Sequence, residues 1–240
     1  MQSTHKKEGV DVKMKKKVNK GKENRDVYDL VKIENFVDYN RKIEKEDTTF
    51  KKLMFIYSVA IRELDTKIGI LKDEFQLFHN YDLIDHVNRR LKAPESIISK
   101  MKKKNLQLTY KTMIENINDI AGIRVICPLK KDVYTIKDSI TKFPGVQILK
   151  EKDYLAKPKK SGYSSYHLIV ETPVPLSQNI AYVKVEIQIR TMAMDFWASL
   201  EHKMKYKPSG TIDKKSSKEW INCAKIVDKL DNKMMMLNEL

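Results

Sequence analysis

A run of lysines beside a glycine and a tyrosine is the first feature of this sequence that indicates chemistry. The segment KPKKSGYSSYH, residues 157–167, places three lysines just before Gly162 and Tyr163. Lysines neutralise phosphate charge, glycine lets the backbone approach a ligand closely, and a tyrosine ring can stack on a base. The segment therefore predicts a site for the phosphates and base of a nucleotide.

Two carboxylates stand next to predicted strands. Asp119 comes directly before the apolar run of residues 120–127, and Glu186 lies inside VKVEIQI. Mg²⁺ typically takes one or two protein carboxylates and completes its shell with water and substrate phosphates. We therefore expect Asp119 and Glu186 to form a magnesium site. Taken singly, Asp119 also fits a turn or cap residue, and Glu186 a solvent-facing residue of an alternating strand.

Further polar side chains could surround this pair. The alternation of residues 183–190 places four polar side chains on one face of a strand: Lys184, Glu186, Gln188 and Arg190. His167 starts another predicted strand, and Asp195 lies on a helix face from which it could reach the site. The guanidinium of Arg124 could lie over a purine, and Arg90 and Lys92 stand two residues apart. For each arginine alone, a surface salt bridge is the simpler role.

Several other kinds of site are not indicated. The sequence has neither a P-loop nor a dinucleotide glycine fingerprint. Its five histidines show no spacing that suits a metal site with cysteine or with each other, so we expect no zinc. Cys127 and Cys223 make no disulfide framework, and we expect both to be reduced packing thiols.

The composition indicates a globular protein with polyanionic partners. The chain has 240 residues, 41% of them hydrophobic, and a formal net charge of +15. This balance favours nucleotides or nucleic acid as partners. No stretch approaches the roughly 18 apolar residues of a membrane span, and the N-terminus lacks the apolar centre of a secretory signal. We therefore expect a cytoplasmic protein with no membrane partner.

The elements that would position these residues follow from the hydrophobic pattern. Helices are expected at Phe50–Phe78, Pro94–Asn105, Val133–Ile140, Met192–Tyr206 and Ser217–Leu240. Strands are expected at Ile84–Leu91 (or a turn), Ile123–Cys127, Val146–Lys150, His167–Glu171 and Val183–Ile189. The prolines of TPVPLSQN, residues 172–179, suit a loop between the last two strands. The pattern predicts an α/β (α+β) fold with a mixed sheet flanked by N- and C-terminal helices.

This organisation divides the chain into four expected regions. Residues 1–25 would form a disordered basic arm, and residues 26–95 an N-terminal helical region. Residues 96–207 would form the α/β core, and residues 208–240 a C-terminal helical extension. The chemistry-bearing segments fall in or beside the expected core.

Four ordered motifs together resemble the synthetase domain of the RelA/SpoT superfamily, and most closely the small alarmone synthetases. The motifs are Arg90–Ser96 (RLKAPES), Asp119–Val125 (DIAGIRV), Lys157–His167 and Glu186–Lys207. The resemblance implies a nucleotidyltransferase-like fold. It also implies transfer of pyrophosphate from ATP to the ribose 3′-hydroxyl of GDP or GTP, which yields AMP and (p)ppGpp. Phosphoryl transfer relies mainly on positioning and charge neutralisation, which suits these residues.

The resemblance also implies a role for each candidate residue. Asp119 would bind Mg²⁺, and Glu186 would assist the metal or the attacking hydroxyl. The ATP side would consist of Arg90, Lys92, Ser96, Lys103 and Arg124, with the two arginines holding adenine. The GDP/GTP side would consist of Lys157, Lys159, Tyr163, His167, Gln188 and Asp195. On that side Tyr163 would stack on guanine and Asp195 would read its edge.

Assembly and alternative functions remain open from the sequence. The resemblance implies a homotetramer with the terminal helices as its interface, and the length of the chain predicts synthesis without a hydrolase domain. A toxin-type synthetase, which would pyrophosphorylate adenosine nucleotides or the 3′ end of tRNA, would carry the same motifs. A non-catalytic RNA-binding module would use the basic segments alone, and RNA binding could also accompany catalysis.

Overall fold

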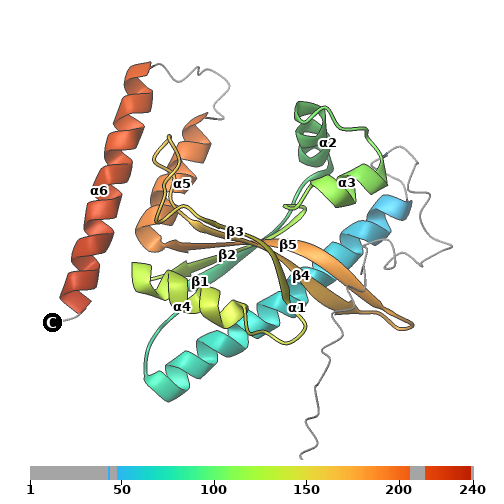
Figure 1. Ribbon diagram of the computed structural model, residues 1–240, viewed down its shortest axis with the longest axis horizontal. Coiled ribbons are helices and arrows are strands. Elements are labelled where there is room, and N and C mark those ends of the chain that lie inside the picture. Colours follow the sequence, from blue (N-terminus) through green and yellow to red (C-terminus); the bar gives the residue numbers. More distant parts are fainter. Residues whose placement is uncertain (1–42, 44–47, 206–213, 239–240) are drawn as a thin grey trace, which may run out of the picture.

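The chain folds around a five-stranded mixed sheet with helices on both of its sides (Figure 1). This computed structural model describes residue 43 and residues 48–205 and 214–238. The expected basic arm, residues 1–25, lies outside the described residues. The strands are β1 (His86–Leu91), β2 (Ala121–Cys127), β3 (Gln147–Asp153), β4 (Tyr166–Pro175) and β5 (Ile180–Thr191). The predicted mixed α/β core is confirmed.

The sheet places the second and fifth strands side by side at its centre. The strand order is β1-β2-β5-β4-β3, with β2 and β5 parallel and the other neighbouring pairs antiparallel. Because β1 pairs with β2 along its whole length, residues 86–91 belong to the core sheet. The expected boundary at residue 95 therefore cuts through the sheet and does not separate a helical region from it.

Helix α1 (Thr48–His79) forms one wall of the core. Its buried side chains recur at three- and four-residue steps, as predicted, and are Phe50, Leu53, Tyr57, Ala60, Ile61, Leu64, Ile68 and Leu71. The helix packs against β2, β4 and β5, while α4 (Lys130–Ile140) contacts β2 and β5 on the same face (Figure 1). The hydrophobic spacing also predicts that Phe78 belongs to this buried stripe, but its side chain is 75% exposed next to the end of the helix, so this prediction was wrong.

The remaining helices differ from the prediction in detail. They are α2 (Pro94–Lys103), α3 (Tyr110–Asn116), α5 (Met192–Lys205) and α6 (Lys214–Asn238), of which α3 was not predicted. In α5 the buried residues are Met194, Trp197 and Ala198, whereas Phe196 is 66% exposed. The hydrophobic spacing predicts a core stripe formed by Ala193, Phe196, Trp197, Leu200 and Met204. For Phe196 this prediction was wrong, because α5 packs on β5 and α6 through a neighbouring face. The thiol of Cys127 is buried as expected, but that of Cys223 is exposed on α6.

The prolines expected in a loop lie in a strand. Pro173 and Pro175 pair with β5 as part of β4, and the turn is confined to residues 176–179. The pairing of β3 with β4 stops at Glu171, so beyond it β4 is an edge strand on that side. Proline lacks the N–H that an inner strand must donate, and an edge tolerates this loss. None of the helices in the described ranges has the length and apolar character that a membrane crossing requires.

The lysine-rich loop is held against α6 at Gly162. This glycine has φ +90, and a Cβ built on it would lie 2.5 Å from the Cβ of Ala224. We expect Gly162→Ala to lower the free energy of unfolding by about 1–3 kcal/mol, because both the backbone conformation and the close packing oppose a methyl group. Chemical denaturation of the purified variant measures this change.

A matched control is available on α1. Gly69 is helical, and a Cβ built there meets nothing within 4 Å. Gly69→Ala should therefore raise the free energy of unfolding by about 0.5–1 kcal/mol, since alanine loses less backbone entropy in a helix. Equal effects of the two substitutions would contradict the proposed packing of the loop on α6.

Candidate active site

The register of the sheet brings the predicted polar residues onto one face. Two neighbouring rows cross the strands: Arg90, Gly122 and Glu186 in the first, and Asn88, Arg124, Gln188 and His167 in the second. A Cβ on Gly122 would have only two backbone oxygens within 4 Å, both at 3.8 Å or more. The glycine therefore leaves a hollow between the charged rows. This hollow is a cavity of about 380 Å³ that Asp119, Arg124 and Glu186 help to line.

Asp119 lies between two lysines at one end of this cavity. It stands two residues before β2, and its Oδ2 accepts from Lys92 Nζ at 3.0 Å and from Lys100 Nζ at 2.8 Å. Burial alone would raise the pKa of Asp119, but the hydrogen bonds and charges of Lys100 and Lys92 outweigh it and lower the pKa. The carboxylate is therefore ionised at neutral pH.

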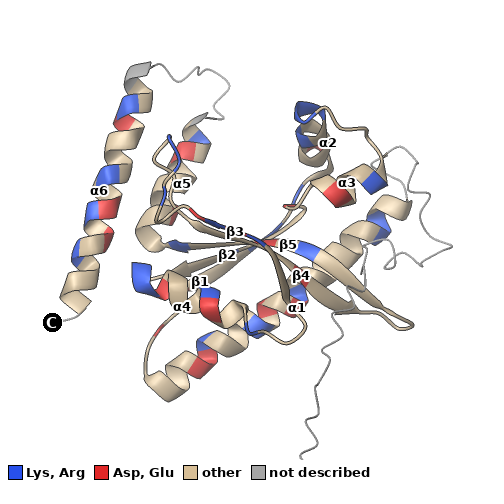
Figure 2. Ribbon diagram, viewed as in Figure 1, with Lys and Arg blue, Asp and Glu red and all other residues tan. Residues whose placement is uncertain are grey.

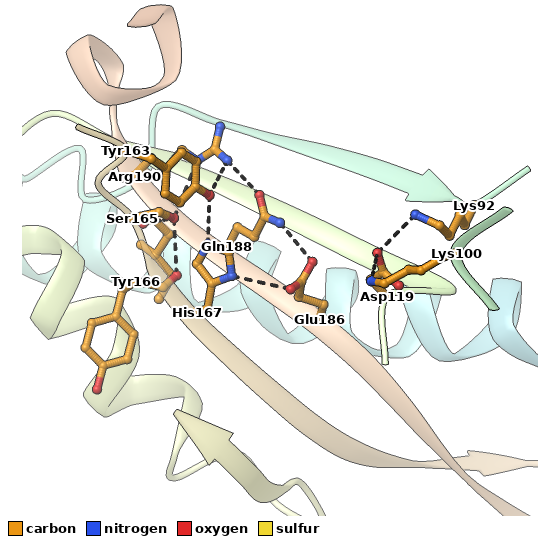
Figure 3. Close-up of polar contacts among 11 residues, drawn as sticks. Lys92, Lys100, Asp119, Tyr163, Ser165, Tyr166, His167, Glu186, Gln188 and Arg190 are labelled. Carbon is orange, nitrogen blue, oxygen red and sulfur yellow. Dashed lines mark hydrogen bonds and ion pairs between the residues drawn. The ribbon is translucent and has the colours of Figure 1, made fainter. Parts of the chain in front are cut away.

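Glu186 lies on β5, and two neighbouring side chains on the same face of the sheet hold it. Its Oε1 is 3.3 Å from Nδ1 of His167, and its Oε2 accepts from Gln188 Nε2 at 2.8 Å. Burial raises the pKa of Glu186, but His167 and Gln188 outweigh burial and the charge of Asp119, so the pKa is lowered. Figure 3 shows Glu186 between His167 on one side and Asp119 with its two lysines on the other.

Arg190 connects several of the residues predicted for the GDP/GTP side, although the sequence prediction gave Arg190 itself no role in the site. The guanidinium is buried and donates to Gln188 Oε1 at 2.9 Å and to the Tyr163 hydroxyl at 2.6 Å. It also pairs with Asp195 Oδ1 at 2.9 Å, and the same oxygen pairs with Arg124 at 3.1 Å. The alternation of residues 183–190 placed Arg190 on this polar face, but it did not show that the side chain would be buried.

Tyr163 stands at the centre of an aromatic and cationic cluster. Lys159 Nζ lies 4.4 Å from the centroid of its ring and 4.6 Å from that of Tyr154. The Arg190 guanidinium carbon lies 5.1 Å from the same Tyr163 centroid. Cations over an aromatic ring are attracted by its π-electrons. A base that stacks on Tyr163 must therefore share the ring with these cations or displace Lys159.

The structure brings together most of the predicted residues but not all. Among the described residues, no side-chain hydrogen bond or ion pair joins Ser96, Lys103 or Lys157 to the two carboxylates, and all three are exposed. Lys100, three residues before Lys103 on α2, occupies the position beside Asp119 instead. One helical turn separates the two lysines, so the basic run of residues 100–104 indicated the right helix but not the right lysine.

The donor set around Asp119 fits a magnesium ion. Its Oδ1 is buried, and no hydrogen-bond partner for it lies among the described residues. A buried carboxylate oxygen without a partner is costly unless something else binds it. Oxygen ligands are those that Mg²⁺ prefers, and Glu186 supplies a second carboxylate in the same cavity.

A second cavity adjoins the first. It has a volume of about 240 Å³ and is lined by Tyr163, Arg190 and residues of α5, including Ser199 and His202. Arg90 and Arg124 line both cavities. Figure 2 shows further lysines on α2 and on the loop beside α5, at the two ends of this polar face. The face can therefore hold two anionic groups side by side, one in each cavity.

Two carboxylates among lysines and arginines in a hollow of a mixed sheet define a protein that handles phosphorylated ligands. A family whose sequence model is described as a region found in RelA/SpoT proteins matches residues 89–211. The chain belongs to the RelA/SpoT family, and the predicted resemblance is confirmed.

The most similar relatives include proteins of Bacillus subtilis. The chain is 44% identical over 186 residues to GTP pyrophosphokinase YwaC of strain 168, which covers 78% of this chain and 89% of YwaC. The crystal structure of small alarmone synthetase 2 has a TM-score of 0.72 at 40% identity and covers 79% of this chain and 98% of its own. The crystal structure of small alarmone synthetase 1 bound to its product pppGpp has a TM-score of 0.74 at 32% identity. This match covers 80% of this chain and 98% of the synthetase 1 chain.

Proposed function

We propose that this protein transfers pyrophosphate from ATP to the 3′-hydroxyl of GDP or GTP, giving AMP and (p)ppGpp. The pair of adjoining cavities that share Arg90 and Arg124 carries the proposal, because the reaction must hold two nucleotides with their reacting ends together. The relatives named GTP pyrophosphokinase and small alarmone synthetase support it.

The ATP side is assigned to the cavity beside Asp119. Arg90 and Arg124 would hold adenine by stacking, and Lys92 would contact the phosphates. Lys100 joins Lys92 in this role because both ammonium groups already meet at Asp119. Ser96 and Lys103, which are exposed on α2, would meet only the outer part of the nucleotide.

The acceptor side is assigned to the cavity beside Arg190. Tyr163 would stack on guanine, with Lys157 and Lys159 at its phosphates and His167 and Gln188 next to the ribose. Asp195 Oδ1 is already shared by two arginines, so its Oδ2 is the oxygen that would accept from the N1 and N2 donors of guanine. Adenine does not offer this pair of donors.

Asp119 and Glu186 would hold Mg²⁺, which when bound neutralises the charge of the transferred phosphates. Lys92 and Lys100 hold Asp119 in place and add positive charge next to the leaving group. His167 and Gln188 fix the Glu186 carboxylate beside the acceptor, so this chain supplies position and charge and forms no covalent intermediate.

The experiment is a product assay. The protein is incubated with ATP, Mg²⁺ and either GDP or GTP, and AMP and a 3′-pyrophosphorylated guanosine nucleotide are expected in equal amounts. Parallel reactions contain AMP or tRNA as the acceptor. A product formed only with those acceptors would establish a toxin-type synthetase. Salt-sensitive RNA binding without any AMP release would establish a non-catalytic RNA-binding module.

The predicted homotetramer is also part of this proposal. Apolar side chains on α5 and α6 are exposed in the single chain, among them Phe196 at 66% and Ile226 at 65%. Large apolar side chains exposed on neighbouring helices favour packing against another subunit. Light scattering after gel filtration should give four times the chain mass of 28.1 kDa, and a monomer at micromolar concentration would contradict it.

A further inference from the structure

Arg190 binds four side chains on the polar face, and neither Asp119 nor Glu186 is among these described partners. It is 4% exposed, and its three nitrogens all have partners. Nε faces Ser165 Oγ at 3.4 Å, Nη1 pairs with Asp195, and Nη2 donates to both Tyr163 and Gln188. One buried guanidinium thus holds residues of the loop, of β5 and of α5 in a single arrangement, and Figure 3 shows it beside Tyr163 and Gln188.

The contact with Arg190 also restricts how Tyr163 can hydrogen-bond to His167. A guanidinium can only donate, so the Tyr163 oxygen accepts from Arg190. The hydroxyl hydrogen is then free to point at Nε2 of His167, which is 2.7 Å away. In the arrangement in which the Tyr163 hydroxyl donates to His167 Nε2, Nδ1 carries the ring proton, which faces Glu186 Oε1 at 3.3 Å.

We propose that Arg190 is the positioning residue of the acceptor site. It fixes the Tyr163 ring and the Asp195 carboxylate that would hold the acceptor nucleotide. By orienting the Tyr163 hydroxyl, it also sets His167 in the tautomer that donates to Glu186. The effect on substrates rests on the function proposed above, whereas the tautomer of His167 belongs to the ligand-free protein and is measured without substrate.

An arginine is required because its planar fork reaches several partners at once. A lysine at this position has one nitrogen, which could replace one or two of these contacts but not all. Arg190→Lys should therefore give a partial loss, and Arg190→Met, which keeps the aliphatic volume, a larger one. Arg62→Met serves as the matched control, because Arg62 is exposed on α1, a helix that contributes no residue to the lining of either cavity.

The first measurement is steady-state kinetics with each substrate varied in turn. Arg190→Met should raise the KM for GDP or GTP about tenfold or more, because at least one hydrogen bond to a charged group is lost on the acceptor side. The KM for ATP should change less than about threefold, with Arg190→Lys intermediate and Arg62→Met like the native protein. Equal losses for ATP and acceptor, or a fall in kcat with both KM values unchanged, overturn the positioning role.

The second measurement is the imidazole ¹⁵N spectrum of ligand-free protein, with the His167 signals assigned through His167→Asn. We expect Nδ1 to be protonated and Nε2 to be an acceptor, and both Arg190→Met and Tyr163→Phe to move the Nε2 signal. A proton on Nε2 in the native protein, or an Nε2 signal that Arg190→Met leaves unchanged, overturns the proposal. Because no substrate is present, this result does not depend on the proposed synthetase activity. A failure of that activity can therefore be told apart from a failure of the positioning role.

Discussion

Asp119→Asn should reduce kcat/KM for pyrophosphate transfer roughly a thousandfold. The change keeps the shape of the side chain but removes the charge that Lys92 and Lys100 surround. It also replaces one carboxylate oxygen of the proposed magnesium site with an amide, which binds hard cations weakly. Initial rates at saturating Mg²⁺, with each substrate varied from below its KM, check the prediction, and a kcat/KM within threefold of the native value would contradict it.

The matched control for this change lies on α4. Asp138 forms an exposed ion pair with Lys137 at 3.0 Å, far from the cavity in the fold. Surface pairs of this kind contribute little, so Asp138→Asn should leave both activity and stability nearly unchanged. The comparison separates loss of a charge in general from loss of the charge that faces the cavity.

The same variant has a pH-dependent effect on stability. The folded-state pKa of Asp119 is lowered from its ordinary value of 3.8, so the ionised form stabilises the fold. This contribution is fully present above pH 3.8, the value expected for the unfolded chain, and is lost as the pH falls through the folded-state pKa. Asp119→Asn should therefore be less stable than the native protein at pH 7, and the difference should shrink with acidification.

Residues 183–190 show what the sequence could and could not predict about the site. Alternation alone placed Glu186, Gln188 and Arg190 on one face, and the structure confirms this. It could not show that Arg190 would be buried, because that depends on Tyr163 and Asp195, which come from other elements. The pattern along one strand predicts on which face of the sheet each side chain lies. The residues that each side chain contacts there depend on tertiary packing.

Local signals failed elsewhere for the same kind of reason. Pro173 and Pro175 indicated a loop, but an edge position that only the strand order defines lets them stay in β4. The basic run at the end of α2 did not distinguish Lys100 from Lys103, because residues three apart lie on the same side of a helix. Which of the two reaches Asp119 depends on where α2 ends relative to β2. Long periodic elements such as α1 were predictable because many residues repeat the same signal.

Glu186→Gln is the second change with a large expected effect, and it addresses the chemical role of this residue. An efficient general base has a pKa near the working pH, whereas His167 and Gln188 outweigh burial and lower the pKa of Glu186. A carboxylate of lowered pKa is a weak proton acceptor but a good partner for a cation. We therefore expect kcat to fall roughly 10²- to 10⁴-fold, chiefly through loss of a magnesium ligand.

Magnesium titration of the Glu186→Gln variant distinguishes the two roles. If Glu186 binds the metal, the variant should require a higher Mg²⁺ concentration for half-maximal activity, and part of the lost rate should return as Mg²⁺ is raised. If Glu186 acts as the base, the Mg²⁺ requirement stays at the native value while kcat remains low at every concentration. Glu63→Gln on α1, where Glu63 forms a half-exposed pair with Lys67 at 3.9 Å, should behave as the native protein in both respects. The hydrogen bonds that hold Glu186 in its ionised form favour the first outcome.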